Sequence, residues 1–209
     1  MNAQETHELN TIQKQVAIGK EIPNFTFEVF HNEKVKKISF SSLRRKWLIL
    51  FFYPADFTFI CPTELEEMAE LYEEFKKQGA EVLSMSTDTV WVHKAWHDQS
   101  VAAKKIMFPM GADPSGKIAK AFGTYIENDG LAMREDEGLS LRGTFIIDPH
   151  GMVQMIEIHA NNIGRSAKEL MRKLQAAKFV AEHDGQVCPA SWNPGDTTLT
   201  PGLKLVGKL

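Results

Sequence analysis

The chain contains one long apolar stretch and, soon after it, a segment in which apolar residues recur at helical spacing. The apolar stretch runs from Trp47 to Tyr53 and predicts a central strand covered on both faces, which Pro54 ends. From Pro62 onward, apolar side chains fall on one helical face and acidic ones on the other, so a helix is predicted that Gly79 ends. The turn between these two elements brings Cys61 to the start of the helix.

Apolar runs and helical spacing of apolar residues predict the remaining elements as well. A strand at residues 81–86 follows the helix, so the two strands should pair in parallel through a right-handed crossover. Further segments are two hairpins (25–30 with 34–39, and 143–148 with 153–159) and two helices (about 90–99 and 166–182). This mixture predicts an α/β protein with a thioredoxin-like fold, in which helices flank a mixed central sheet. We expect a single domain, with a lead-in to about residue 20 and a C-terminal arm from about residue 184.

Composition and charge narrow the possible classes of function. The 209 residues are 43% hydrophobic and 24% charged, as in a globular protein with one domain. A formal net charge of −3 disfavours nucleic acid as the main partner. The longest apolar run is too short to cross a bilayer, so no membrane partner is expected. The polar N-terminal segment lacks the apolar stretch of a signal peptide, which favours a cytoplasmic location.

The chain has two cysteines, in very different surroundings. A thiol at the position of Cys61 lies beside the unpaired N–H groups and the positive dipole end of a helix, and both favour the reactive thiolate. Cys188 lies in a polar segment near the C-terminus, which suggests a redox pair rather than a structural disulfide. The alternative for Cys61 is a buried, unreactive cysteine that packs as a small apolar residue. Neither cysteine belongs to a C-x-x-C pair, so zinc and dithiol sites are disfavoured.

Three segments resemble a known family: PADFTFICPTE, MREDEGLSLRGTFIIDPHG and VCPASW. The first contains the pattern P-x-x-x-T-x-x-C, formed by Pro54, Thr58 and Cys61. From about residue 25 to residue 209 the chain resembles the typical two-cysteine peroxiredoxins, especially their bacterial alkyl hydroperoxide reductase branch. The resemblance implies a thiol-dependent peroxidase that reduces hydrogen peroxide and organic hydroperoxides in antioxidant defence. It implies no metal, haem or flavin cofactor.

The resemblance also assigns roles near the first cysteine, each with a simpler alternative. Cys61 is the peroxidatic nucleophile, which attacks the peroxide and becomes a sulfenic acid. Thr58 hydrogen-bonds the peroxide or the thiolate, and otherwise only caps the helix. Pro54 shields the thiolate from water, or only ends the strand. Arg142 contacts the sulfur and the peroxide, and its alternative is an exposed surface charge.

Two supporting residues and a second thiol complete the implied site. Arg165 orients the groups around the sulfur, and Glu64 pairs with the arginines or is an ordinary acid in the first helical turn. Cys188 is implied to be the resolving cysteine, which forms a disulfide with Cys61 of the partner subunit in a homodimer that assembles into a decameric ring. An external disulfide reductase, either a flavoprotein or a thioredoxin-type donor, then reduces it. The alternative is a permanent intrachain disulfide.

Other functions and sites remain open at this stage. One is an oligomeric holdase chaperone or redox-signalling scaffold; a protein thiol–disulfide oxidoreductase is disfavoured because C-x-x-C is missing. His93 and His97 are spaced to share a helical face as metal ligands, but surface histidines are the preferred interpretation. The ending TPGLKLVGKL lacks the Tyr-Phe pair of easily over-oxidised relatives, so Cys61 is expected to resist sulfinic acid formation. Residues 117–131 look longer than in the bacterial enzymes, and no function follows from this.

Overall fold

The computed structural model describes residues 16–127 and 136–208, which form two compact units. The described residues up to Arg165 form the first unit, and those from Ser166 onward form the second. Most of the predicted N-terminal lead-in, and residues 128–131 of the segment that looked long, lie outside the described residues. The domain organisation expected from the sequence, one domain with an arm from about residue 184, stays a prediction.

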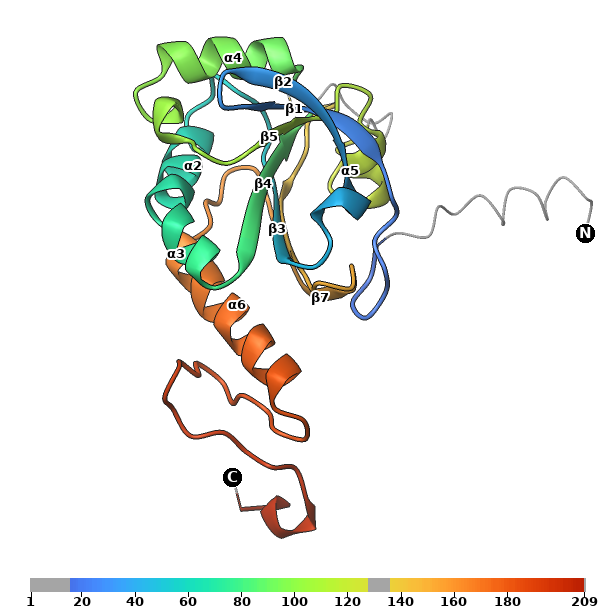
Figure 1. Ribbon diagram of the computed structural model, residues 1–209, viewed down its shortest axis with the longest axis vertical. Coiled ribbons are helices and arrows are strands. Elements are labelled where there is room, and N and C mark those ends of the chain that lie inside the picture. Colours follow the sequence, from blue (N-terminus) through green and yellow to red (C-terminus); the bar gives the residue numbers. More distant parts are fainter. Residues whose placement is uncertain (1–15, 128–135, 209) are drawn as a thin grey trace, which may run out of the picture. The chain divides into compact units, whose positions relative to one another are not determined.

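The first unit is built on a mixed, seven-stranded sheet with the order β2-β1-β5-β4-β3-β6-β7 (Figure 1). Its strands are β1 (Thr26–His31), β2 (Lys34–Ser39), β3 (Trp47–Phe52), β4 (Ala80–Ser86), β5 (Met110–Ala112), β6 (Arg142–Ile147) and β7 (Val153–His159). The β3–β4 and β4–β5 pairs are parallel, and the other pairs are antiparallel. The predicted parallel crossover and both predicted hairpins are therefore confirmed.

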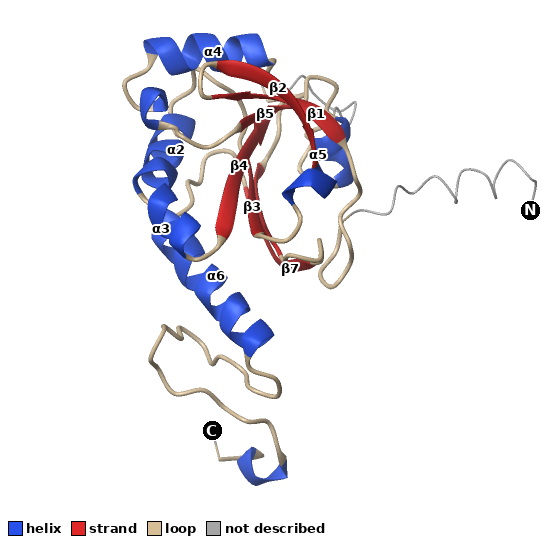
Figure 2. Ribbon diagram, in the orientation of Figure 1, coloured by secondary structure: helices blue, strands red, loops and turns tan. Residues whose placement is uncertain are grey.

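Helices lie on both faces of this sheet (Figure 2). The α-helices of the first unit are α2 (Cys61–Glu70), α3 (Tyr72–Lys77), α4 (Val90–Gln99) and α5 (Lys117–Ala121), and short 3₁₀ turns are η1 (Phe40–Leu43) and η2 (Ala103–Lys105). Helix α6 (Ala167–Glu182) and the 3₁₀ turn η3 (Leu203–Leu205) belong to the second unit. No helix among the described residues combines the length and the apolar character that crossing a membrane would require.

The core explains why β3 reads as an unbroken apolar run. All six of its residues are buried, because successive side chains point to opposite faces and both faces are covered. Leu48, Leu50 and Phe52 join one core cluster with residues of α5, including Ile118 and Ala121. The alternate residues of β3 point to the other face, on which α2 and α3 lie. The carboxyl end of β3 therefore lies between two layers of packed side chains, one on each face of the sheet.

Two features differ from the sequence-based expectation. The predicted single helix after Pro62 is two helices, because the backbone of Leu71 (φ −96°, ψ 1°) leaves the helical region between α2 and α3. Strand β5 and helix α5 were not predicted. They contain only three and five residues, which is too short for either period to be recognised.

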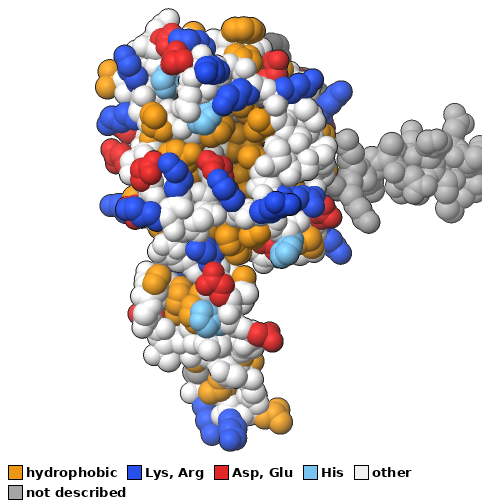
Figure 3. Space-filling view, in the orientation of Figure 1, with side chains coloured by type: hydrophobic (Ala, Val, Ile, Leu, Met, Phe, Trp, Pro, Cys, Tyr) orange, Lys and Arg blue, Asp and Glu red, His pale blue; other side chains and the backbone are white. Residues whose placement is uncertain are grey.

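Charge is mixed on the one face of the molecule that Figure 3 draws. On the face drawn in Figure 3, acidic and basic side chains are interspersed, and no large patch of a single sign is visible. That face offers no extended basic surface of the kind that contacts nucleic-acid phosphates.

Candidate active site

Cys61 occupies the position that the sequence predicts, at the first residue of helix α2. Residues 53–60 connect the carboxyl end of β3 to this helix, and the Cys61 side chain is buried. Because Cys61 is the first residue of α2, its sulfur lies at the positive end of the helix dipole, where the N–H groups of Thr63 and Glu64 donate to the Ile60 carbonyl. The following proline, Pro62, tolerates this position because its missing N–H would be unpaired there.

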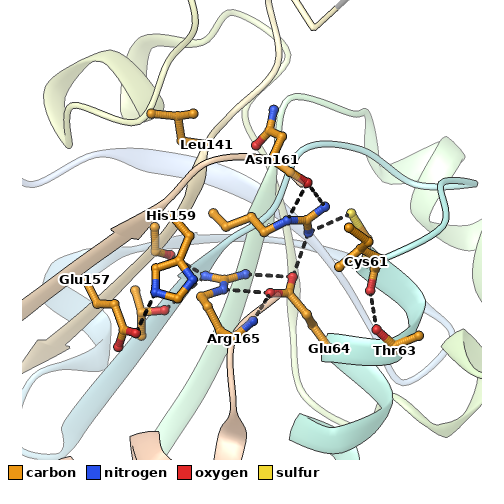
Figure 4. Close-up of polar contacts among 12 residues, drawn as sticks. Cys61, Thr63, Glu64, Leu141, Glu157, His159, Asn161 and Arg165 are labelled. Atoms are coloured by element: carbon orange, nitrogen blue, oxygen red, sulfur yellow. Dashed lines mark hydrogen bonds and ion pairs between the residues drawn. The ribbon is translucent and has the colours of Figure 1, made fainter. Parts of the chain in front are cut away.

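A buried arginine contacts the sulfur. Nη1 of Arg142 lies 3.4 Å from Cys61 Sγ and 2.8 Å from Oε2 of Glu64 (Figure 4). On its other side, Nε and Nη2 donate to the backbone carbonyl of Asn161 at 3.0 and 2.7 Å. The guanidinium is therefore fixed from two directions, with one N–H edge toward the sulfur.

Sheet topology explains how residues so distant in sequence meet. Strands β3 and β6 are antiparallel, with Phe51 opposite Thr144. The start of β6, where Arg142 lies, is therefore beside the end of β3, from which the chain continues toward Cys61. This pairing delivers a cation to the start of helix α2.

Glu64 and Arg165 form the second layer of the site. Nε and the backbone N–H of Arg165 donate to Oε1 of Glu64 at 2.9 and 2.8 Å, and Nη2 donates to Oε2 at 3.0 Å. Nη1 of Arg165 donates to the Gly143 carbonyl at 2.9 Å and to the Thr144 hydroxyl at 3.0 Å. The guanidinium carbon also lies 3.4 Å from the centroid of the Phe51 ring. Glu64 thus bridges two arginines, as expected, and Arg165 is anchored on β3 and β6.

The electrostatics of this cluster favour an ionised carboxylate. Burial alone raises the pKa of Glu64, but the hydrogen bonds and charge of Arg165, together with the charge of Arg142, outweigh it and the pKa is lowered. Burial lowers the pKa of Arg165, and pairing with Glu64 opposes that shift. With both arginines protonated, the three groups carry one net positive charge next to Cys61.

The loop before Cys61 holds the other two predicted residues. Pro54 is buried, and Thr58 is half-buried with its hydroxyl donating to the carbonyl of Ala55 at 2.8 Å. Thr58 does not cap helix α2, because the N-cap position is Ile60 and no side chain caps it. The simple capping alternative for Thr58 is therefore wrong.

A buried polar network, which the sequence analysis missed, anchors the same loop. Asp56 accepts a hydrogen bond from the Tyr53 hydroxyl at 2.7 Å, and its second carboxylate oxygen lies 2.7 Å from Nδ1 of His93. The Asp56 N–H donates to Asp88 at 2.9 Å, and Nε2 of His93 lies 3.0 Å from the Gly111 carbonyl. The sequence could have pointed to Tyr53 and Asp56, because they lie on either side of Pro54 in the cysteine motif. It could not have pointed to Asn161, because this residue contacts Arg142 through its backbone carbonyl.

This network corrects the expectation for one histidine. His93 is fully buried on α4, so the prediction that it lies at the surface is wrong, whereas His97 is half-buried. Burial alone lowers the pKa of His93, but its hydrogen bond and charge interaction with Asp56 outweigh it, so the pKa is raised. The pKa of Asp56 is also raised, by burial, although His93 opposes this shift. The histidine is buried because each ring nitrogen has a fixed partner.

Two groups in the described part of the chain carry side chains of the types that bind metals. They are Asp56 with Asp88 and His93, and Glu33 with His97 and Asp98; in each, the candidate ligand atoms lie within 4.8 Å of one another. The first group forms the hydrogen bonds described above. In the second, the Lys94 ammonium pairs with Glu33 at 3.0 Å and Asp98 at 2.6 Å. Hydrogen bonds and ion pairs with neighbouring residues therefore account for the position of the side chains in both groups.

Cys188 belongs to the second unit and is a free, half-buried thiol. Its sulfur lies 3.9 Å from the carbonyl oxygen of Ala176 on α6. Burial raises the pKa of Cys188, and the charge of Arg172 opposes the shift. Among the predicted site residues, direct contacts connect Cys61, Arg142, Glu64 and Arg165. Cys188 lies in the second unit.

Comparison with known proteins shows the family to which the chain belongs. Residues 18–156 match the sequence model of the AhpC/TSA family, and residues 176–204 match that of the C-terminal domain of 1-Cys peroxiredoxin. The chain is 46% identical over 192 residues to alkyl hydroperoxide reductase C of Salmonella typhimurium, covering 92% of this chain and 98% of the relative. The corresponding protein of Bacillus subtilis gives the same identity and coverage.

Solved structures are similar as well. The crystal structure of Enterococcus faecalis AhpC has a TM-score of 0.77 and 41% identity, covering 84% of this chain and all of that chain (100%). A reduced 2-Cys peroxiredoxin of Plasmodium vivax has a TM-score of 0.78 and 29% identity, covering 87% of this chain and 91% of that one. The fold is therefore that of a thioredoxin-like peroxiredoxin. The chain belongs to the AhpC/TSA family, and it is a thiol-dependent hydroperoxide reductase whose substrates are hydroperoxides.

Proposed function

We propose that Cys61 is the peroxidatic cysteine and that its thiolate attacks the protonated oxygen of a hydroperoxide. The S–O bond forms as the O–O bond breaks, and Cys61 becomes a sulfenic acid. The departing alkoxide or hydroxide takes up a proton and leaves as an alcohol or as water. Hydrogen peroxide and small organic hydroperoxides are the proposed substrates.

The observation that carries this proposal is the 3.4 Å contact between Nη1 of Arg142 and Cys61 Sγ. The guanidinium stabilises the thiolate before attack and then the negative charge that develops on the departing oxygen. Because Glu64 and the Asn161 carbonyl already hold the guanidinium, little reorganisation is needed when that charge appears. Such preorganised donors contribute strongly in a buried site, where the dielectric is low.

Thr58 and Pro54 shape the path of the peroxide in this proposal. The Thr58 hydroxyl donates to the Ala55 carbonyl, so its oxygen is oriented to accept a hydrogen bond. In an organic hydroperoxide, only the oxygen that the thiolate attacks carries a proton, and in hydrogen peroxide both oxygens do. Thr58 therefore accepts from that O–H and holds it toward the sulfur. Pro54 excludes water from the same side.

Glu64 and Arg165 act as positioning residues. Glu64 binds Arg142 through one carboxylate oxygen, and both of its oxygens accept from Arg165. Arg165 is itself tied to the sheet through Gly143 and Thr144. This chain of contacts fixes the guanidinium of Arg142 relative to helix α2.

Cys188 is the proposed resolving thiol, supplied by the partner subunit of a homodimer. Its sulfur attacks the Cys61 sulfenic acid, a disulfide forms and water leaves, which also prevents further oxidation. An external flavoprotein or thioredoxin-type reductase returns two electrons, and a reducing cytoplasm is the expected compartment. Assembly of the dimers into a decameric ring is part of this proposal.

Non-reducing electrophoresis after one equivalent of hydrogen peroxide tests the scheme. The wild type should form a covalent dimer, and Cys61→Ser and Cys188→Ser should not. A covalent dimer that persists in either variant contradicts the assignment of that cysteine, and an intrachain disulfide contradicts the exchange between subunits. Protection of a client protein by Cys61→Ser, without any peroxidase activity in the wild type, would favour the holdase alternative.

A further inference from the structure

One stripe of helix α6 carries the segment that contains Cys188. Arg172, Ala176 and Phe179 recur at helical spacing along it. The Cys188 sulfur lies against the Ala176 carbonyl at 3.9 Å, and the Trp192 ring centroid lies 5.0 Å from that of Phe179. The segment from Cys188 to Trp192 is therefore packed along this stripe, although it has no regular secondary structure.

Arg172 makes the polar contacts that hold this segment. Its Nη1 donates to the backbone carbonyl of Trp192 at 2.9 Å. Its Nε and Nη2 donate to the two carboxylate oxygens of Glu169 at 2.8 and 2.7 Å. A guanidinium is a rigid fork, so the paired Glu169 fixes the direction in which Nη1 points. The arginine thus joins the first turns of α6 to the residue four positions after Cys188.

The segment is also closed upon itself. Val187 and Leu199 exchange two backbone hydrogen bonds, of 2.9 and 3.0 Å. Within the loop that they close, the Trp192 indole donates to the Asp196 carbonyl at 3.1 Å, and the Trp192 side chain is only 3% exposed. Residues 187–199 therefore form a compact loop, which we call the resolving loop, and its anchor on α6 is the Arg172–Trp192 contact.

The same arginine acts on the sulfur electrostatically. Burial raises the pKa of Cys188, and the positive charge of Arg172 counteracts the shift. Three further titratable groups near this stripe have contacts with residues other than Cys188. Glu169 pairs with Arg172 and lies 3.8 Å from Lys173, and the Asp196 carboxylate accepts from the Asn193 N–H at 2.8 Å. His183, the residue after the end of α6, stacks on Phe179, and its Nδ1 lies 2.8 Å from the Phe179 carbonyl.

We propose that Arg172 is a positioning residue for the resolving step: it holds the resolving loop on α6 and keeps a positive charge beside the Cys188 sulfur. The inference rests on the proposed role of Cys188 as the resolving thiol. When that thiol attacks the sulfenic acid of Cys61, a disulfide forms, the S–O bond breaks, and the thiol proton leaves with the hydroxide as water. Arg172 favours the ionised sulfur before the attack. Breaking its contact with Trp192 releases the loop so that the sulfur can travel.

Two variants separate these two effects. Arg172→Gln removes the charge, and Arg172→Lys keeps the charge but lacks the fork that binds Glu169 and the Trp192 carbonyl together. In the full-length Cys61→Ser protein, the rate of Cys188 alkylation by iodoacetamide is measured against pH. Arg172→Gln should lower the thiolate fraction at pH 8 about two- to fivefold, the effect expected of a partly exposed charge pair. Arg172→Lys should keep the wild-type pH midpoint and expose residues 187–199 to limited proteolysis.

Lys173→Gln is the matched control, because it removes one positive charge from the next residue of the same helix. It should leave both the pH midpoint and the proteolysis pattern unchanged. An Arg172→Gln midpoint equal to that of the wild type, or an equal shift in Lys173→Gln, overturns the electrostatic part. Unchanged proteolysis in Arg172→Lys overturns the anchoring part. If Cys61–Cys188 disulfides never form in the wild type, the proposed role of Cys188 fails instead, and the alkylation results still judge Arg172.

Discussion

Replacing Glu64 by glutamine isolates the buried ionic cluster behind the active site. The Glu64 side chain is 2% exposed, and the paired side chains of Arg142 and Arg165 are 4% and 3% exposed. Glutamine has nearly the same size but carries no charge. The substitution therefore leaves two buried guanidinium groups facing a neutral amide, next to each other and to Cys61.

The expected loss of stability is large for a single substitution. Removing one partner of a buried ion pair costs about 3–5 kcal/mol, because the remaining charge is left uncompensated in a low-dielectric site. For a chain of this size, each kcal/mol shifts Tm by about 2–4 °C, so Tm should fall by about 6–20 °C. Exposed pairs contribute only about 0–1 kcal/mol. Glu73→Gln, which breaks the exposed Glu73–Lys76 pair, is therefore the matched control.

The pH dependence adds an independent check with a definite sign. The pKa of Glu64 in the folded protein is lowered from its ordinary value of 4.5. Its contribution to stability is therefore fully present above the unfolded-state pKa and is lost as pH falls through the folded-state pKa. The stability difference between wild type and Glu64→Gln should be constant near neutral pH and shrink below about pH 4.5.

Urea unfolding at one fixed protein concentration measures these differences, because association also contributes to apparent stability. Glu64→Gln should have a clearly lower unfolding midpoint than Glu73→Gln at pH 7. Equal midpoints for the two variants would refute the reasoning, since the buried cluster would then contribute no more than a surface pair. A difference that grows as the solution is acidified would contradict the assigned sign.

Three further predictions concern catalysis. Arg142→Lys should lower kcat/KM about 10²- to 10³-fold, as is typical when a donor to developing negative charge is lost. Stopped-flow measurement of peroxide consumption tests this, and a change below threefold contradicts the role of Arg142. Thr58→Ser should retain most of the peroxidase activity, and Thr58→Val should lower it at least about tenfold, because only valine lacks the accepting oxygen. Equal rates for the two variants would show that the hydroxyl is not used. Repeated turnover with excess peroxide should leave Cys61 free of sulfinic acid by intact mass, whereas a rapid gain of two oxygens contradicts the expected resistance.

The regular elements near the site were predictable from local patterns. The apolar run of β3 and the helical period after Pro62 placed Cys61 correctly at the start of the helix that follows the turn. The identities of Glu64, Arg142 and Arg165 came from the resemblance, because no local pattern links residues that meet only through the antiparallel pairing of β3 and β6. Periodicity alone could not supply that register.

Other parts of the site were beyond the sequence patterns for physical reasons. The Asn161 carbonyl holds Arg142 through the backbone, so its side-chain type carries no signal. His93 was expected at the surface because the sequence shows no carboxylate or third metal ligand beside His93 and His97. Its burial depends on Asp56 and on the Gly111 carbonyl, which belong to other elements of the fold. Polar residues with such long-range partners are invisible to any method that reads only neighbouring positions.

The most direct test of the account is a single turnover of the Cys188→Ser protein with one equivalent of hydrogen peroxide, followed by intact mass and peptide mapping. The account predicts that the peroxide is consumed and that one oxygen is added to each subunit at Cys61. The matching Cys61→Ser protein should consume none. Peroxide consumption that continues in Cys61→Ser, or an oxygen located on another residue of Cys188→Ser, would contradict the assignment of Cys61 as the thiol that reduces the peroxide.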